Sequence, residues 1–191
     1  TEGLGKRVFL YSCSKLFTVT GVLRLVERGV IGLDDPVSKY LPAFGRAFVM
    51  ENGAPRPPHN TMTLRHLFTM SAGLDYNLQT APIQAAARKA DADTISVDNA
   101  IPESPLCFDP GDRFQYSLCH DVLAAVAEAA TGKPFAEYMA QEVFAPLGMQ
   151  RTSYTYTEEE LAPQYLFDAD ARVFQPYPNA CGYILSPHYY S

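Results

Sequence analysis

A serine and a lysine three residues apart, Ser12 and Lys15, are the residues of this chain whose types and spacing best support chemistry. Residues three apart on a helix share a face, so the lysine amine can reach back one turn to the serine hydroxyl. A serine hydroxyl attacks a carbonyl effectively only when a neighbouring base takes its proton. The unpaired amides of a helix N-terminus would also stabilise the oxyanion that this attack creates. The pair therefore favours acyl transfer.

The residues around this pair predict a helix over residues 12–28, closed by Gly29. The apolar residues spread around most of the helix circumference, and they are Leu16, Phe17, Val19, Val22, Leu23, Leu25 and Val26. A helix that is apolar on most sides is normally buried on several of them. We therefore expect Ser12 to lie deep in a cleft.

The pattern is not limited to residues 12–15, because it extends over three blocks of sequence in a fixed order. They are 12–15 with 33–42, then 63–74, and then 110–117 followed by 131–134 and 146–149. Together these blocks resemble the serine β-lactamase and penicillin-binding protein superfamily, in particular its class C-like branch of β-lactamase-related hydrolases and esterases. The resemblance implies a β-lactamase/transpeptidase-like α+β fold. It also implies a serine hydrolase of β-lactamase, D-alanyl-D-alanine carboxypeptidase or esterase type, which forms an acyl-enzyme with a β-lactam, ester or peptide-like substrate.

The same resemblance assigns catalytic roles to three residues. Ser12 would be the acylated nucleophile, Lys15 its activating amine, and Tyr116 the phenol that completes the proton relay. The amine can accept a proton only where burial or nearby positive charge disfavours the ammonium form, and a phenol beside an ammonium group loses its proton more readily. Which of the two groups is the base stays open, as it does among related enzymes.

Two departures from the family pattern bear on the substrate. The tyrosine motif usually has Asn or Ser two residues on, whereas here it reads Tyr116-Ser117-Leu118. We take Ser117 and Leu118 as candidate substrate-binding residues. A leucine side chain forms no hydrogen bonds, so Leu118 favours a simple esterase or peptidase over a β-lactamase. The family's third motif, Lys-Thr-Gly or His-x-Gly, does not occur in the sequence.

The length of 191 residues and the missing third motif predict that residues 1–191 form a partial β-lactamase-like domain. We expect the chain to contain the helix that carries Ser12 and Lys15, called here the SxxK helix, and the helical region of the fold. We expect it to lack the N-terminal strands and most of the antiparallel sheet. The final run, residues 183–191, resembles the family just before a glycine-rich segment. A chain of this kind is expected to be poorly active, and to expose an apolar face of its SxxK helix or to self-associate.

Composition narrows the class of partner. The net charge of -6 and the absence of a Lys/Arg cluster in the sequence argue against nucleic acid. No apolar stretch is long enough for a transmembrane segment, so the expected partner is a small-molecule substrate. We expect no cofactor and no metal, because the four histidines are scattered and HExxH is absent. The compartment stays open between the cytoplasm and export.

The cysteines and one histidine have a structural and a chemical interpretation. The cysteines, Cys13, Cys107, Cys119 and Cys181, show no metal-ligand spacing, and we expect small buried thiols. His120 lies close to Tyr116 in sequence and was weighed as a catalytic group. A packing role is favoured, because His120 stands at the start of a predicted helix for which Ser117 could supply the cap.

Five helices are predicted, over residues 12–28, 63–71, 82–90, 119–131 and 134–145. Two proline-rich stretches, 48–60 and 101–111, are predicted to be loops.

Two other classes of function were considered. A non-hydrolytic penicillin-recognising or ligand-binding sensor module, which acylates slowly or not at all, stays open, although such a protein would more often have lost Ser12, Lys15 or Tyr116. An α/β-hydrolase is excluded, because that fold requires a GxSxG elbow and none occurs in the sequence.

Overall fold

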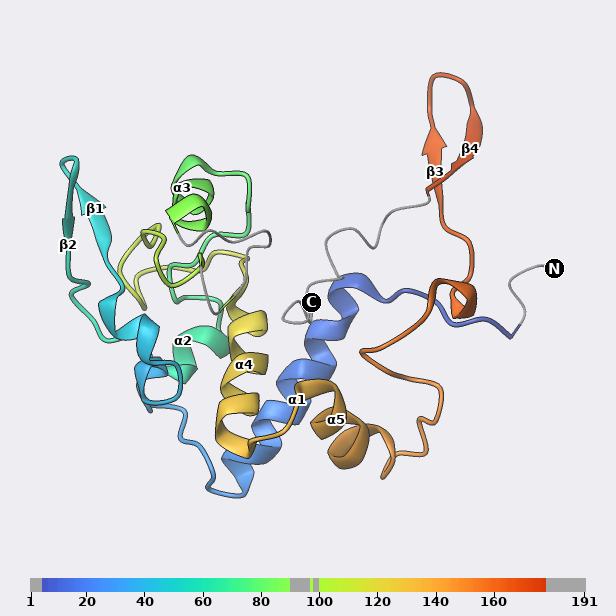
Figure 1. Ribbon diagram of the computed structural model, residues 1–191, viewed down its shortest axis with the longest axis horizontal. Helices are drawn as coiled ribbons and strands as arrows, with labels where there is room; N and C mark the ends of the chain where they lie inside the picture. Colours follow the sequence, from blue (N-terminus) through green and yellow to red (C-terminus); the bar gives the residue numbers. More distant parts are fainter. Residues whose placement is uncertain (1–4, 90–96, 98–99, 178–191) are drawn as a thin grey trace.

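The computed structural model describes residues 5–89, 97 and 100–177 (Figure 1). Within these residues the helices are α1 (Ser14–Glu27), α2 (Leu64–Phe68), α3 (Ala81–Lys89), α4 (Cys119–Thr131) and α5 (Phe135–Met139), and the strands are β1 (Val49–Glu51), β2 (Ala54–Arg56), β3 (Tyr165–Asp168) and β4 (Val173–Pro176). Each predicted helix is present, and the one predicted over 134–145 is α5 continued by a π-helical turn over Ala140–Phe144. Position 90 of the third predicted helix, Cys181 and the run 183–191 lie outside the described residues.

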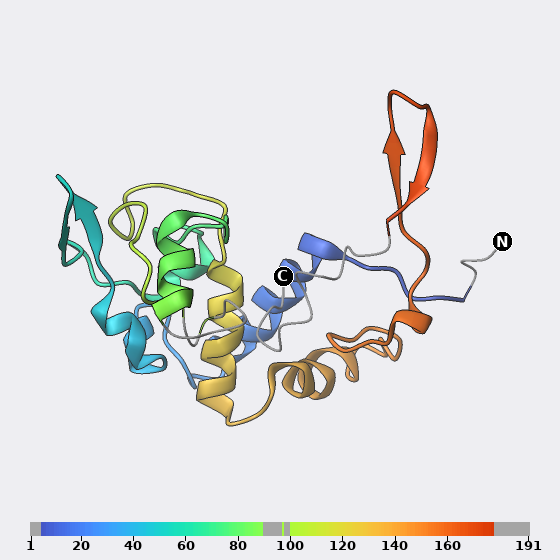
Figure 2. The ribbon, with the colours of Figure 1, turned by 45° about the horizontal axis from the view of Figure 1, so that its top comes forward.

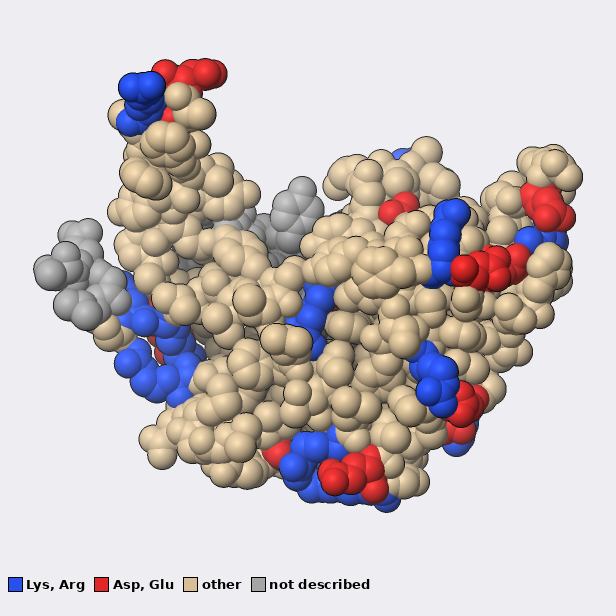
Figure 3. Space-filling model, turned by 180° about the vertical axis from the view of Figure 1, so that it is seen from behind, with Lys and Arg blue, Asp and Glu red and all other residues tan. Residues whose placement is uncertain are grey.

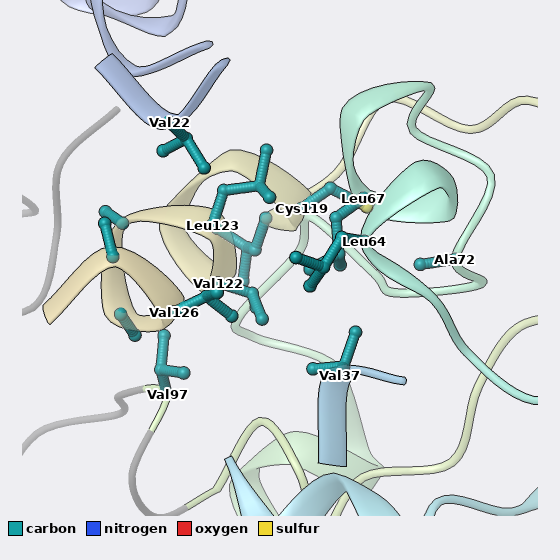
Figure 4. Close-up of a cluster of buried hydrophobic side chains, with 14 of the residues drawn as sticks. Val22, Val37, Leu64, Leu67, Ala72, Val97, Cys119, Val122, Leu123 and Val126 are labelled. Atoms are coloured by element: carbon teal, nitrogen blue, oxygen red, sulfur yellow. The ribbon is translucent and has the colours of Figure 1, made fainter. Parts of the chain in front are cut away.

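The packing of α1 against α4 forms the centre of the molecule (Figures 1 and 2). The segment from Cys119 to Ala127 of α4 is buried throughout, and apart from His120 and Asp121 its residues are small or apolar. α1 contacts one side of α4 and α2 contacts another. Figure 4 shows the resulting core, in which Val22 of α1 and Leu67 of α2 lie near Leu123 of α4. The regular secondary structure of the described residues is mainly helical, as expected for the α-helical part of the predicted fold.

A glycine lets α5 approach α1 closely. Gly21 is buried in the middle of α1, and a Cβ atom at this position would overlap Sδ of Met139. The Tyr138 hydroxyl donates a hydrogen bond to the Gly21 carbonyl over 2.8 Å. The absence of a side chain at Gly21 thus allows α5 to pack directly on the helix that follows Ser12.

α1 is closed by the predicted Gly29 and α4 by Gly132, but the start of α4 does not use the predicted serine. Gly29 and Gly132 both have a φ of +68°, which is the left-handed conformation that ends a helix. At the start of α4, Leu118 occupies the cap position without a side-chain cap hydrogen bond, and the Ser117 hydroxyl instead lies 3.0 Å from Sγ of Cys119. The prediction that Ser117 caps this helix was therefore wrong.

The stretch predicted as a loop over 48–60 contains a β-hairpin. β1 and β2 pair antiparallel, joined by Asn52 and Gly53 with φ values of +51° and +81°. Positive φ at both central positions is what a type I′ turn requires. Arg56 then fixes this hairpin to the loop before α4 through two hydrogen bonds to the Asp109 carboxylate, of 2.9 and 2.7 Å. The hydrogen bonds from Arg56 hold the pKa of Asp109 well below its usual range.

The second hairpin, β3–β4, projects from the body of the molecule (Figure 1). Its strands pair antiparallel from Tyr165–Pro176 to Asp168–Val173. Both faces carry exposed apolar side chains, with Phe167 and Phe174 on one face and Leu166 on the other. A two-stranded sheet with no third strand is marginally stable by itself. Packing within the described residues therefore contributes little to holding this hairpin.

α1 is less covered than its apolar pattern predicts. Leu16 is 73% exposed and Leu23 is 42% exposed, although Val22 and Leu25 are buried. Ser12 is itself exposed rather than deep in a cleft, because it lies at the end of α1 beyond its contact with α4. The expected exposed apolar face is thus present in the described residues. Self-association stays a prediction.

The expectation of buried thiols is wrong for two of the three described cysteines. Cys13 and Cys107 are exposed, whereas Cys119 is buried. Burial raises the pKa of the Cys119 thiol to about 11. Cys13 follows Ser12 in the turn before α1, where neighbouring elements do not cover it.

The described residues contain neither a candidate membrane-spanning helix nor a candidate metal cluster. No helix there combines the length and the apolar character needed to cross a membrane. Nor do three or more His, Cys, Asp or Glu residues gather there in an arrangement that could hold a metal ion.

Substitution of Gly21 by alanine is expected to destabilise the chain. The intrinsic helix propensity favours alanine by about 1 kcal/mol, but the added methyl group must displace the buried Met139 side chain. We expect the free energy of unfolding in urea to fall by about 1–3 kcal/mol. Thr20→Ala, at the exposed neighbouring position of α1, is the matched control and should change it by less than about 0.5 kcal/mol. An increase in stability in Gly21→Ala would contradict this prediction and would show that α5 can move away from α1 at little cost.

Because His120 is buried, we expect the chain to lose stability in mild acid. Burial lowers the pKa of His120 below 6.5, an interaction with the Phe68 backbone opposes this, and the charge of Lys15 lowers it further. A base whose pKa is lowered on folding binds protons better when unfolded, so stability decreases as the pH falls below about 6.5. The decrease in melting temperature between pH 7 and pH 5 should be smaller in His120→Leu than in the unchanged chain. An equal decrease in His120→Leu and in the unchanged chain would contradict the assignment.

Candidate active site

Ser12 lies in a tight turn immediately before α1. The turn is a 3-10 helix over Tyr11–Cys13, and Tyr11 has a φ of +47°. The Cys13 amide donates to the Leu10 carbonyl over 3.1 Å, so this amide is engaged and does not supply the oxyanion stabilisation expected from the sequence. The turn leaves the Ser12 side chain exposed.

Lys15 lies in the first turn of α1 and is buried, with only 5% of its surface exposed. Its Nζ donates to Ser12 Oγ over 3.5 Å, which is a long hydrogen bond. The same Nζ lies 4.9 Å from the centre of the Tyr116 ring. Because an ammonium group is attracted to an aromatic face, this ring helps to hold the amine beside the serine.

Tyr116 approaches Ser12 from the segment that precedes α4. Its hydroxyl donates to Ser12 Oγ over 2.6 Å, although the two residues are 104 positions apart in the sequence. Two backbone hydrogen bonds fix the segment, from the Gln115 amide to the Met70 carbonyl over 2.9 Å and from the Leu118 amide to the Asp75 carbonyl over 3.4 Å. The turn after α2 therefore sets the position of the phenol.

The structure thus brings together the three residues to which the resemblance assigned catalytic roles. Ser12 comes from the turn before α1, Lys15 from the first turn of α1, and Tyr116 from the segment before α4. The hydroxyl at the centre has an amine on one side and a phenol on the other. This arrangement has the parts for moving a proton away from the serine oxygen as that oxygen attacks a carbonyl.

Tyr76 belongs to the same cluster and was not identified from the sequence. Its ring centre lies 5.2 Å from that of Tyr116 and 5.7 Å from Lys15 Nζ. The Asp75 carboxylate holds the backbone here by accepting from the amides of Tyr76 and Asn77 over 2.7 and 3.1 Å. The aspartate before the tyrosine is a local turn signal, but only the tertiary packing places the ring at the site.

Ser117 and Leu118, the candidate substrate-binding residues, do not lie at the surface beside Ser12. Each is only 1% exposed. The Ser117 hydroxyl contacts the Cys119 thiol, and the Leu118 side chain belongs to the hydrophobic core. A substrate at Ser12 could not contact either side chain in this structure, because the first residues of α4 turn them inward.

The chain was compared with known proteins by family model, sequence and structure. The family model described as Beta-lactamase matches residues 5–179. Esterase EstB of Burkholderia gladioli is 36% identical over 159 residues, which are 79% of this chain and 39% of that esterase. The chain therefore spans about two-fifths of the length of this curated relative.

Two solved structures extend the comparison. EstCE1, described as a hydrolase with promiscuous acyltransferase activity, is 30% identical with a TM-score of 0.70, and the alignment covers 87% of this chain and 44% of that chain. The LovD9 mutant of simvastatin synthase from Aspergillus terreus is 25% identical with a TM-score of 0.78, covering 92% of this chain and 48% of that chain. These likenesses place the described helices in the β-lactamase/transpeptidase fold. By the match of its family model over nearly the whole sequence, the chain belongs to the beta-lactamase family, whose members here are serine hydrolases and acyltransferases.

Proposed function

We propose that Ser12 is the nucleophile of a serine hydrolase that cleaves its substrate through an acyl-enzyme. The observation that carries the proposal is the convergence on Ser12 Oγ of the Tyr116 hydroxyl at 2.6 Å and the Lys15 amine at 3.5 Å. A serine with only a capping role would need neither neighbour. The family resemblance supports the same assignment of roles.

The proposed reaction begins with the attack of Ser12 Oγ on the substrate carbonyl carbon. The serine proton passes to the basic member of the Lys15–Tyr116 pair, and the carbonyl becomes a tetrahedral oxyanion. When this intermediate collapses, the bond to the leaving group breaks and the pair returns the proton to the leaving oxygen or nitrogen. Water then hydrolyses the acyl group from Ser12. The tyrosine rings near Lys15 Nζ help to hold the amine beside the serine.

The proposed substrate class is a carboxylic ester. Leu118 stands where the family motif usually carries an amide or hydroxyl side chain, and its burial removes it from contact with a substrate. A β-lactam side chain would therefore find no hydrogen-bonding group at this position. EstB and EstCE1, an esterase and a hydrolase by name, support the same preference.

A second candidate is a non-hydrolytic ligand-binding or penicillin-recognising sensor module. The feature that favours it is the long contact between Lys15 and Ser12, since 3.5 Å is beyond the usual range for efficient proton transfer. Such a module would bind or acylate slowly without turning over. For the same reason we expect the 191-residue chain to be a poor catalyst.

Intact-mass spectrometry after exposure to a fluorophosphonate, and separately to benzylpenicillin, tests the nucleophile. We expect one fluorophosphonate adduct per chain, lost in Ser12→Ala and kept in Ser14→Ala, which changes another serine two residues further on. A penicillin adduct that depends on Ser12 would replace the ester preference with β-lactam recognition. If the unchanged chain formed no adduct, the assignment of Ser12 as a nucleophile in this chain would be rejected, and the sensor module would be favoured.

The roles of the neighbours are tested by the rate of that labelling. Lys15→Met and Tyr116→Phe should each slow labelling about 10²–10⁴-fold, which is the usual contribution of a general base. Tyr76→Phe removes a hydroxyl from the same cluster but keeps the ring, so it should change the rate less than about threefold. Circular dichroism should confirm that each variant is folded. Equal rates for all three variants would remove the proton relay from the mechanism.

A further inference from the structure

A cavity separate from the Ser12 hydroxyl lies between the first described residues and the segment before β3. One wall is the segment 6–11 with Ser14, and the other is the segment 151–156 with Leu161. Two backbone hydrogen bonds join the walls, from the Arg7 amide to the Glu160 carbonyl over 2.9 Å and from the Ala162 amide to the Arg7 carbonyl over 2.7 Å. The volume of about 380 Å³ lies within the range of small-molecule sites.

The interior of this cavity is largely apolar and aromatic. The Phe9 ring lies 4.7 Å from that of Tyr11 and 5.7 Å from that of Tyr156, edge to face in both cases. Tyr154 is fixed from behind, because its hydroxyl lies 2.8 Å from Oγ1 of Thr18 and donates to the Ser14 carbonyl over 3.1 Å. These side chains offer a preformed apolar surface to a ligand.

Three cations line the same cavity, and two of them donate to backbone carbonyls. Lys6 donates to the backbone carbonyl of Glu159 over 2.9 Å, and Arg151 donates to the carbonyl of Gly5. Among the side chains that the structure describes, neither has a carboxylate within ion-pair distance, and Arg7 has only Glu160 at 3.7 Å. Figure 3 shows Lys and Arg atoms gathered at the left, below the projecting hairpin. This positive site is notable in a chain whose net charge is -6.

We infer that this cavity binds an amphipathic monocarboxylate, with its apolar body against Phe9 and its carboxylate at Lys6 and Arg151. A carbonyl oxygen leaves the positive charge of its donor uncompensated, whereas a carboxylate neutralises it. An apolar body with one anionic end matches the two chemistries of the lining. Tyr11 and Ser14, which line the cavity, flank Ser12, so the site lies next to the proposed nucleophile without including its hydroxyl.

Calorimetric titration of the Ser12→Ala chain with octanoate, and with its neutral analogue octanamide, tests the inference. Octanoate should bind at least tenfold more tightly than octanamide, and added salt should reduce the difference. In Lys6→Gln/Arg151→Gln the affinity for octanoate should fall about fivefold or more, while the affinity for octanamide stays the same. Phe9→Ala should weaken both ligands, because it removes apolar surface that both use.

Arg88→Gln removes an exposed cation of α3, away from the cavity, and is the matched control for non-specific attraction. Equal affinities for octanoate and octanamide, or equal losses in the control and the double variant, would overturn the inference. So would the failure of the Ser12→Ala chain to bind either ligand at millimolar concentration. Because every measurement is made without the Ser12 hydroxyl, these outcomes are independent of the labelling experiments that test the proposed function.

Discussion

The candidate site depends on the packing of α1 against α4. These helices are separated by about ninety residues of chain, yet Ser12 and Lys15 stand at the start of one, and Tyr116 immediately precedes the other. Small residues make the approach possible, since the buried face of α4 is rich in alanine and Gly21 lets α5 close on the other side of α1. The energy of burying these apolar faces, of the order of 25 cal/mol for each Å², thus fixes a polar cluster at their ends.

The residues of that cluster differ in their exposure to solvent. The amine of Lys15 is enclosed by aromatic rings, while the hydroxyl of Ser12 and part of Tyr116 face solvent. A buried amine pays a solvation penalty that an exposed one does not, and the ring faces offset only part of it. The proposed nucleophile, Ser12, is thus accessible to a substrate, while the Lys15 amine is shielded from water.

The helices of this fold could be predicted from the sequence because each carries its own local signals. The apolar run after Lys15, the run after His120, and the glycines at positions 29 and 132 were sufficient for α1 and α4. The β1–β2 hairpin was missed although Asn52-Gly53 is a strong turn signal, because the prolines around it were given more weight. Tyr76, the inward rotation of Leu118 and the cationic cavity depend on contacts between distant segments, and no local pattern encodes them. The convergence of Tyr116 on Ser12 was anticipated only through the family resemblance.

The β3–β4 hairpin is expected to be locally less stable than the helical core around α4. Its amides are held by two strands with solvent on both faces, whereas those of α4 lie under α1 and α2. Opening the hairpin exposes little new apolar surface, so it requires far less free energy than global unfolding. Hydrogen exchange in the hairpin would therefore follow local fluctuations, while exchange in α4 would follow the unfolding of the core. The cavity and the turn that carries Ser12 belong to the segments that join this hairpin to the helical core. Their local stability is therefore expected to lie between that of the hairpin and that of α4.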